Sequence, residues 1–153
     1  MAQSEFNYFT YPTPHGPLTI RASKHGICEI VLSEAQLEGV KRASELTNTA
    51  ATQLQEYFAG KRHYFDFPLD VRGSSFQKLV WTEVCEIPYG ETRSAADIAG
   101  AIGKPGAHRS VGTAIRRNPL PIAIPTHRVD LPGTKGANAK VFAAFRAFES
   151  ANV

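Results

Sequence analysis

This chain has few cysteines, and long apolar runs and leader-like segments are missing. Each of these shortages excludes a class of protein. The 153 residues include only Cys28 and Cys85, too few for a zinc framework or a disulfide scaffold. We expect both to be reduced thiols that serve in packing, as in a protein of a reducing compartment. No run of about eighteen apolar residues could span a membrane, and the N-terminus lacks the basic and apolar regions of a secretory signal. The sequence therefore predicts a cytoplasmic, nucleoid or nuclear protein, with no metal or organic cofactor.

Charge is unevenly distributed along the chain. The formal net charge is +3, yet residues 1–75 carry 7 basic and 8 acidic side chains, whereas residues 76–153 carry 10 and 6. The first half is thus slightly acidic and the second half clearly basic. A basic surface attracts anionic partners, and this asymmetry favours DNA as the partner of the second half.

The N-terminal part of the chain predicts a small antiparallel sheet. Short segments rich in β-branched and aromatic residues alternate with turns that contain proline and glycine. The expected strands are residues 6–11, 18–23 and 27–32. Cys28 falls within the third strand, where a packing role is expected.

A helix and a linker follow this sheet. Apolar residues return at helical spacing, so we expect a helix over about 47–59 that ends at Gly60. Residues 71–75 contain glycine and serine and are typical of a linker. The sequence therefore predicts an α+β chain of two domains, an N-terminal α/β domain over 1–70 and a helical domain over 76–153.

The second domain is expected to be mostly helical, with a helix-turn-helix of the winged-helix-like kind. The expected helices are 76–86, 94–102, 107–116 and 138–149. Ser94 with Asp97 approximates a capping box at the start of the second helix, and a glycine-containing turn at 103–106 separates it from the third. The side chains expected in or near the core are Phe76, Leu79, Val80, Trp81, Val84, Ile98, Ala101, Ile102, Val141, Phe142, Phe145 and Phe148.

Residues 118–129 interrupt the helical pattern. The segment contains Pro119, Pro121 and Pro125. Each proline removes a backbone donor and restricts the residue before it, so we expect extended or turning backbone rather than a helix.

Several motifs occur in order along the chain and carry a family resemblance. They are Gln55 to Arg62, Phe76-Gln77 with Val80-Trp81, Ile87-Pro88-Tyr89-Gly90-Glu91-Thr92, Ala99 to Gly112, and Asn118 to Val129. Together they closely resemble the motifs of the O6-alkylguanine-DNA alkyltransferases, the suicide repair proteins, over about residues 8–149. The resemblance implies the fold of that family and double-stranded DNA, in which O6-alkylguanine is the lesion, as the partner.

The resemblance also implies roles for the residues of the active-site segment. Thr126 takes the position of the cysteine that receives the alkyl group from the damaged base. His127 and Glu149 match the pair that draws the proton from this nucleophile through a water. Asn118 matches the hinge residue that braces the active-site turn. Arg128 matches a structural arginine of the motif, and we also count it among the expected DNA contacts.

The helix that starts at Ala107 matches the recognition helix, which lies in the minor groove in this family. Arg109 matches the arginine that enters the base stack where the damaged nucleotide has been flipped out. Small side chains let the helix backbone approach the groove, and basic side chains contact phosphates. The expected small residues are Ser110, Gly112 and Ala114, and the expected phosphate contacts are Arg116, Lys104 and Arg117.

The chain departs from the family where the chemistry takes place. A cysteine, with a reference pKa of about 8.5, needs only about 2 kcal/mol to ionise at pH 7, whereas the hydroxyl of Thr126 is a far weaker acid. Ala95 replaces the tyrosine that presses on the DNA backbone during flipping. Residues 131–138 shorten the loop that walls the pocket and lack its tyrosine, and Phe142 replaces a lysine. Cys85 is not expected to act as a substitute nucleophile.

Three functions are consistent with these residues. The first is a DNA-binding homologue that cannot accept the alkyl group and senses the lesion for a partner protein of another repair pathway, as alkyltransferase-like proteins do. The second is a general DNA-binding or regulatory module without lesion recognition. The third is an active methyltransferase with an unusual acceptor. We expect the first, and therefore expect no methyl transfer to Thr126.

Overall fold

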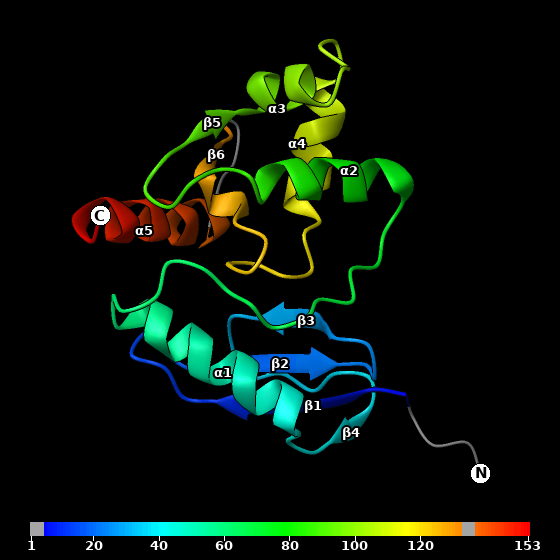
Figure 1. Ribbon diagram of the computed structural model, residues 1–153, viewed down its shortest axis with the longest axis vertical. Coiled ribbons are helices and arrows are strands. Elements are labelled where there is room, and N and C mark those ends of the chain that lie inside the picture. The colour runs from blue at the N-terminus through cyan, green and yellow to red at the C-terminus, as the bar shows by residue number, and fades with distance from the viewer. Residues whose placement is uncertain (1–4, 133–136) are drawn as a thin grey trace. The chain divides into compact units, whose positions relative to one another are not determined.

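The computed structural model describes residues 5–132 and 137–153 and has the α+β class that the sequence predicts. The chain divides into two compact units, Met1–Arg72 and Gly73–Val153. The first consists of a sheet and one helix, and the second is mostly helical (Figure 1). No helix in the described ranges is both long and apolar enough to cross a membrane.

The first unit is a four-stranded sheet with one helix against it (Figure 1). The strands are β1 (Asn7–Tyr11), β2 (Leu18–Ala22), β3 (Ile27–Val31) and β4 (Val40–Lys41). The first three form the predicted antiparallel meander. The two-residue β4 was not predicted, and it pairs in parallel with β1 to give the order β3-β2-β1-β4. Ile20 on β2 faces Phe9 on β1 and Ile30 on β3 in this register.

The helix of this unit is α1, Glu45–Phe58. It starts two residues before the predicted position because Ser44 caps it: the Ser44 Oγ accepts from the Thr47 amide, and the Thr47 Oγ1 accepts from the Ser44 amide. It ends as predicted before Gly60, whose φ of 75° is left-handed backbone that favours glycine. Leu54 is fully buried on the side of α1 that packs on the sheet.

The second unit contains all four predicted helices, with ends within two residues of the predicted ones. Its elements are α2 (Ser75–Val84), β5 (Arg93–Ser94), α3 (Ala95–Ala101), α4 (His108–Arg116), the 3-10 helix η1 (Thr126–Arg128), β6 (Val129–Asp130) and α5 (Ala137–Ala151). The sequence did not predict β5 and β6, which form a short parallel pair. This pair fixes the segment after η1 beside the start of α3.

Two contacts position the helices that matter for the site. The buried Trp81 indole on α2 donates to the carbonyl of Ala114 on α4 across 2.9 Å. Ser94 and Asp97 form the predicted capping box of α3, with bonds of 2.9 and 3.0 Å. The α3–α4 turn contains Gly103 at φ 76°, which a residue with a Cβ adopts only under strain.

The predicted core needs correction at two helical positions. Leu79 is 43% exposed, because α2 turns Val80, Trp81 and Val84 inward and leaves Leu79 on the outer side. On α3, Ala99 rather than Ala101 is buried beside Ile98. Spacing placed Val80, Val84 and Ile98 correctly and failed at Leu79 and Ala101.

The two cysteines differ in their surroundings, and both thiols are free. Cys28 is buried in β3, as predicted, and burial raises the pKa of its thiol. Cys85 directly follows α2 and is exposed. The prediction that Cys85 serves in packing was therefore wrong.

Candidate functional site

The segment between α4 and η1 is a proline-rich turn that Asn118 holds together. The Asn118 Oδ1 accepts from the Leu120 amide at 2.8 Å, and the Nδ2 donates to the Ile124 carbonyl at 2.8 Å. The same Nδ2 donates to the Thr126 Oγ1 at 3.0 Å. The segment turns, as predicted, but then forms η1 immediately after Pro125, since a proline is compatible with the start of a helical turn.

The middle of this turn carries an unusual backbone conformation. Ile122 has a φ of 73°, which is left-handed backbone at a β-branched residue and costs roughly 1–2 kcal/mol. Its side chain is buried, and so are those of Leu120 and Ile124 on either side. Packing and the Asn118 bonds therefore hold a conformation that the local sequence would not adopt by itself.

Thr126 lies at the end of the turn with 1% of its surface exposed. An amide nitrogen can only donate, so the Thr126 oxygen must be the acceptor in its bond with Asn118. The hydroxyl hydrogen is then left for a different acceptor. Thr126 is thus a fixed, buried hydroxyl at the position where the family resemblance implies a thiol.

His127 and Glu149, which the sequence analysis paired, lie together in this unit. The His127 Nε2 and the Glu149 Oε2 are 2.6 Å apart, and both residues are 1% exposed. Phe145 on α5 packs edge-on against the imidazole, with ring centroids 5.5 Å apart. The pair is therefore a direct, buried contact between η1 and α5.

Burial lowers the pKa of His127 below its usual value, and the positive charges of Arg128 and Arg146 act in the same direction. The hydrogen bond and the charge of Glu149 oppose this effect but are smaller than the effect of burial. A neutral imidazole that faces a carboxylate carries its hydrogen on Nε2 and donates it. The other ring nitrogen then has a lone pair with which it can accept a proton.

Glu149 also binds Arg128. The Arg128 Nε and Nη2 donate to the two carboxylate oxygens at 2.8 and 3.1 Å, and the Nη1 donates to the Ile87 carbonyl at 2.8 Å. The Gly90 amide donates to the same carboxylate at 3.1 Å. Arg128 is buried, and each of its three guanidinium nitrogens donates a hydrogen bond within the protein. It therefore braces the site, and its role as a DNA contact stays a prediction.

The predicted recognition helix α4 has one buried and one exposed side. His108, Arg109, Ser110, Thr113 and Arg116 are exposed, as are Lys104 before the helix and Arg117 after it. In the described part of the chain, none of these arginines or Lys104 forms an ion pair. Cations without a protein partner form an electropositive surface that suits a polyanion.

Two of the three small residues assigned to the groove-facing side are buried. Gly112 lies on the inner side of α4, and a Cβ there would be 3.4 Å from the Arg116 Nη1 and 3.8 Å from Leu131. Ala114 is buried as well, and its carbonyl accepts the bond from Trp81. Ser110 is therefore the exposed one of the three.

A small cavity adjoins the site, and its charged residue lies outside the motifs of the sequence. The cavity has a volume of about 100 Å³ and is lined by Val129, Leu131, Ala139, Phe142 and Arg146. The Arg146 Nη1 donates to the carbonyl of His127 at 3.1 Å. The signal that could have revealed Arg146 is its spacing, four residues after Phe142 and three before Glu149, which places all three near one side of α5.

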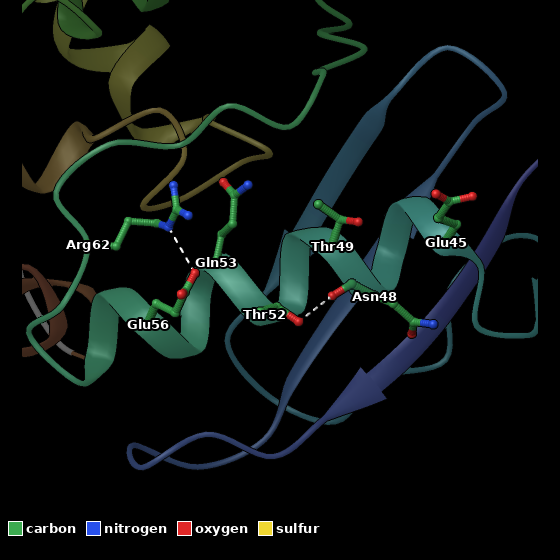
Figure 2. Close-up of a pocket in the computed structure, with 7 residues that line it drawn as sticks. All are labelled: Glu45, Asn48, Thr49, Thr52, Gln53, Glu56 and Arg62. Carbon is green, nitrogen blue, oxygen red and sulfur yellow. Dashed lines mark hydrogen bonds and ion pairs between the residues drawn. The ribbon is translucent and has the colours of Figure 1, made fainter.

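A larger hollow lies elsewhere, in the first unit, and contains none of the predicted site residues. It has a volume of about 530 Å³ beside α1. Figure 2 shows Arg62 reaching to Glu56, with which it forms an ion pair at 3.0 Å. Its lining residues are Glu45, Asn48, Thr49, Thr52, Gln53, Glu56 and Arg62. In the described ranges no group of three or more His, Cys, Asp or Glu residues could hold a metal ion.

The shortened loop predicted for 131–138 falls largely on residues 133–136, which lie outside the described residues. Its effect on the cavity therefore stays a prediction.

Comparison with known proteins gives the same family over both units. Residues 7–71 match the ribonuclease-like domain of 6-O-methylguanine DNA methyltransferase, and residues 75–136 match the DNA binding domain of the same family. The constitutive methylated-DNA–protein-cysteine methyltransferase of Bacillus subtilis is 45% identical over 130 residues, 80% of this chain and 79% of that protein. The enzyme of Mycobacterium tuberculosis H37Rv is 43% identical over 131 residues, 80% of this chain and 77% of that protein.

Solved structures indicate the same family. The crystal structure of the Mycobacterium tuberculosis O6-methylguanine methyltransferase has a TM-score of 0.86 at 36% identity, covering 97% of this chain and 94% of that one. A structure of the Mycobacterium tuberculosis protein in complex with DNA has the same score and identity, with 96% and 94% covered. This chain therefore belongs to the 6-O-methylguanine DNA methyltransferase family.

Proposed function

We propose that this chain is a DNA-binding member of its family that recognises alkylated guanine in duplex DNA and does not accept the alkyl group. The observation that carries the proposal is Thr126, a buried hydroxyl 3.0 Å from the Asn118 amide nitrogen, in the place where the resemblance implies the nucleophilic cysteine. A hydroxyl there is far less reactive than a thiol.

Thr126 cannot take over the chemistry of a thiol. A thiolate is accessible near neutral pH because the reference pKa of cysteine is about 8.5. An alcohol is a much weaker acid, and the neutral His127 is a weak base whose Nε2 faces Glu149. The imidazole would therefore have to remove a proton from a group that holds it far more tightly.

DNA binding is supported by the exposed side of α4. Arg109 and Arg116 are exposed without an ion pair in the described part of the chain. A related protein from Mycobacterium tuberculosis, similar over 96% of this chain, has been crystallised with DNA. We assign Arg109 to the gap that a flipped nucleotide leaves, and Arg116 to a phosphate. A repair-pathway protein would then be needed to remove the lesion.

A general DNA-binding module is the second candidate, and Ala95 favours it. This residue opens α3 and is half-buried, and a methyl group reaches much less far than the tyrosine that the resemblance implies there. A weaker push on the backbone would reduce flipping while leaving the phosphate contacts of α4 in place.

Binding to two duplexes that differ only by one O6-methylguanine separates the two candidates. Tighter binding to the modified duplex at moderate salt supports the lesion sensor. Equal affinity with a steep salt dependence supports the general module. Intact-mass measurement after incubation with the modified duplex tests the third function, because one methyl group gained per chain would demonstrate transfer to an unusual acceptor.

A further inference from the structure

The second unit contains a groove between the end of α2 and the start of α3. Its volume is about 330 Å³, and its lining includes no residue of α4, η1 or α5. The buried Ile87 and Ile98 form most of the apolar part of this lining. The charged part consists of Glu83, Glu86, Asp97 and Arg93. We call it the acidic groove, because three carboxylates line it together with a single guanidinium.

The protein does not neutralise the carboxylates of the acidic groove. In the described part of the chain, neither Glu83 nor Glu86 forms an ion pair. Arg93 is 3.5 Å from Glu91, a carboxylate that does not line the groove. Asp97 accepts a hydrogen bond from the backbone at the start of α3, which lowers its pKa and keeps it ionised at neutral pH. Negative charge therefore gathers at one place in a unit that is basic as a whole, and it attracts a cationic partner.

The outer side of α2 extends this groove with apolar side chains. Phe76, Leu79, Glu83 and Glu86 follow one another at spacings of three and four residues, so they lie along one side of the helix and of the turn that ends it. Phe76 is half-buried, and Leu79 is 43% exposed. This side of α2 is thus apolar near its N-terminal end and acidic near its C-terminal end.

This combination fits a segment of another protein better than DNA or a small ion. DNA carries the same sign of charge as the acidic groove and is repelled by it. In the described ranges no group of three or more His, Cys, Asp or Glu residues could hold a metal ion. A polypeptide can bring apolar side chains to Leu79 and basic side chains to Glu83 and Glu86. The methylene stems of lysine or arginine also suit the apolar lining that Ile87 and Ile98 provide.

We propose that the acidic groove and the outer side of α2 dock a basic, amphipathic segment of a partner protein. Its basic residues pair with Glu83 and Glu86, and its apolar residues cover Leu79. This inference rests on the proposed function in one respect, since a sensor that does not remove the lesion needs a partner protein. Its test contains no DNA, so a failure of docking leaves lesion recognition untouched.

The test is an NMR titration of the isotope-labelled full chain with a synthetic peptide. The peptide is an alanine-rich helix that carries two leucines one turn before two arginines on the same side. A counterpart with glutamate in place of both arginines is the control peptide. The basic peptide should shift the backbone amides of Leu79, Glu86 and Ile98 in a saturable way, with a Kd below about 1 mM. The acidic counterpart should leave these amides unshifted.

Substitutions test the charged and the apolar contacts separately. Glu86→Gln should weaken binding of the basic peptide about threefold, the size of one exposed ion pair. Leu79→Ala should weaken it about fivefold, because it removes apolar surface that docking would bury. Glu34→Gln is the matched control and should leave the affinity unchanged. Glu34 is exposed in the first unit and forms no ion pair in the described ranges.

Reversal of charge in the groove gives a stricter test. Glu83→Lys combined with Glu86→Lys should abolish binding of the basic peptide and make the acidic counterpart the tighter ligand. A double variant that still prefers the basic peptide would overturn the proposal. Thermal unfolding establishes that each variant is folded. The wild-type comparison of the two peptides tests the proposal even where a variant does not fold.

Four results with the wild-type chain would also overturn the inference. Unsaturable shifts, or equal shifts with both peptides, would mean that the surface has no preference for a basic segment. Shifts confined to the hollow beside α1 would place the peptide elsewhere. Spermidine that binds the same amides as tightly as the peptide would make the groove a site for small cations. Shifts of these amides with protein concentration alone would make its occupant a second copy of this chain. The comparison of modified and unmodified duplexes measures lesion recognition independently of all four.

Discussion

The side-chain amide of Asn118 donates to the hydroxyl of Thr126 across 3.0 Å, and the same nitrogen donates to the carbonyl of Ile124. One side chain therefore fixes both the turn and the orientation of the hydroxyl at its end. The neighbouring His127 and Glu149 are 2.6 Å apart in a buried pair. The site thus keeps an ordered arrangement of side chains around a group that is a poor nucleophile.

Thr126→Cys should restore an acceptor for the alkyl group. The substitution introduces a thiol with a reference pKa of about 8.5 next to His127, whose second ring nitrogen can accept a proton. We expect a gain of one methyl group per chain after incubation with O6-methylguanine DNA, detected by intact-mass measurement, and no gain for the wild-type chain. Thr126→Ser is the control, and it should also remain unmodified. An unmodified Thr126→Cys that still binds the lesion would mean that Ala95 or Phe142, rather than Thr126 alone, prevents transfer.

Glu149→Gln should destabilise the second unit strongly. The carboxylate binds His127, Arg128 and the Gly90 amide while 1% exposed. Its loss leaves the buried Arg128 charge without a counterion, which typically costs about 3–5 kcal/mol. Urea unfolding should show a decrease of that order in the free energy of unfolding.

The control for this prediction is Glu91→Gln. Glu91 is exposed and lies 3.5 Å from Arg93, and an exposed pair of this kind contributes about 0–1 kcal/mol. Equal effects of the two substitutions would contradict the bracing role of Glu149.

Much of the fold could be predicted from the sequence because local signals and tertiary packing agree. The predicted capping pair Ser94–Asp97 and the prolines of 118–129 act through nearby backbone groups. The Ser44–Thr47 cap, which starts α1 two residues early, was not predicted. The positions of Leu79 and Arg128 could not be predicted in this way. Leu79 is exposed because Trp81 binds the Ala114 carbonyl and sets the rotation of α2. Arg128 is buried because Glu149, which lies 21 residues later on α5, accepts a hydrogen bond from its guanidinium.

The candidate site was predictable only as far as motifs extend. Family resemblance grouped Asn118, Thr126, His127 and Glu149. In the structure these residues lie in one unit, with direct bonds between two pairs. The positive φ of Ile122 had no sequence signal, since it depends on the packing of the whole turn. Arg146 lies outside every motif, and its relevance follows from a cavity that only the fold creates.

The stability of the chain should fall as the pH drops below about 6.5. Burial lowers the pKa of His127 in the folded state, whereas in the unfolded state it returns to its usual value of about 6.5. The unfolded state therefore binds the proton first as the pH falls. The contribution of His127 to the free energy of unfolding is fully present above about pH 6.5. As the pH falls, it decreases by at most about 1.4 kcal/mol per pH unit until the lowered pKa of the folded state is reached.

Urea unfolding at pH 7 and pH 5.5 measures this effect. His127→Gln should reduce the difference between the two pH values, because it removes the titrating group. His108→Gln serves as the control, since His108 is exposed on α4. A difference that persists unchanged in His127→Gln would assign the pH dependence to other groups.

Arg109→Ala and Arg116→Ala should weaken DNA binding in different ways, although both remove one exposed cation from α4. If Arg109 fills the space of a flipped base, its loss removes the preference for the O6-methylguanine duplex. If Arg116 contacts a phosphate, its loss weakens binding to modified and unmodified duplexes alike and lowers the salt slope by about one. Affinities for both duplexes, measured over a series of salt concentrations, give the two quantities separately. An Arg109→Ala chain that keeps its lesion preference would contradict the role assigned to Arg109, and identical behaviour of the two variants would reduce α4 to a surface that holds phosphates.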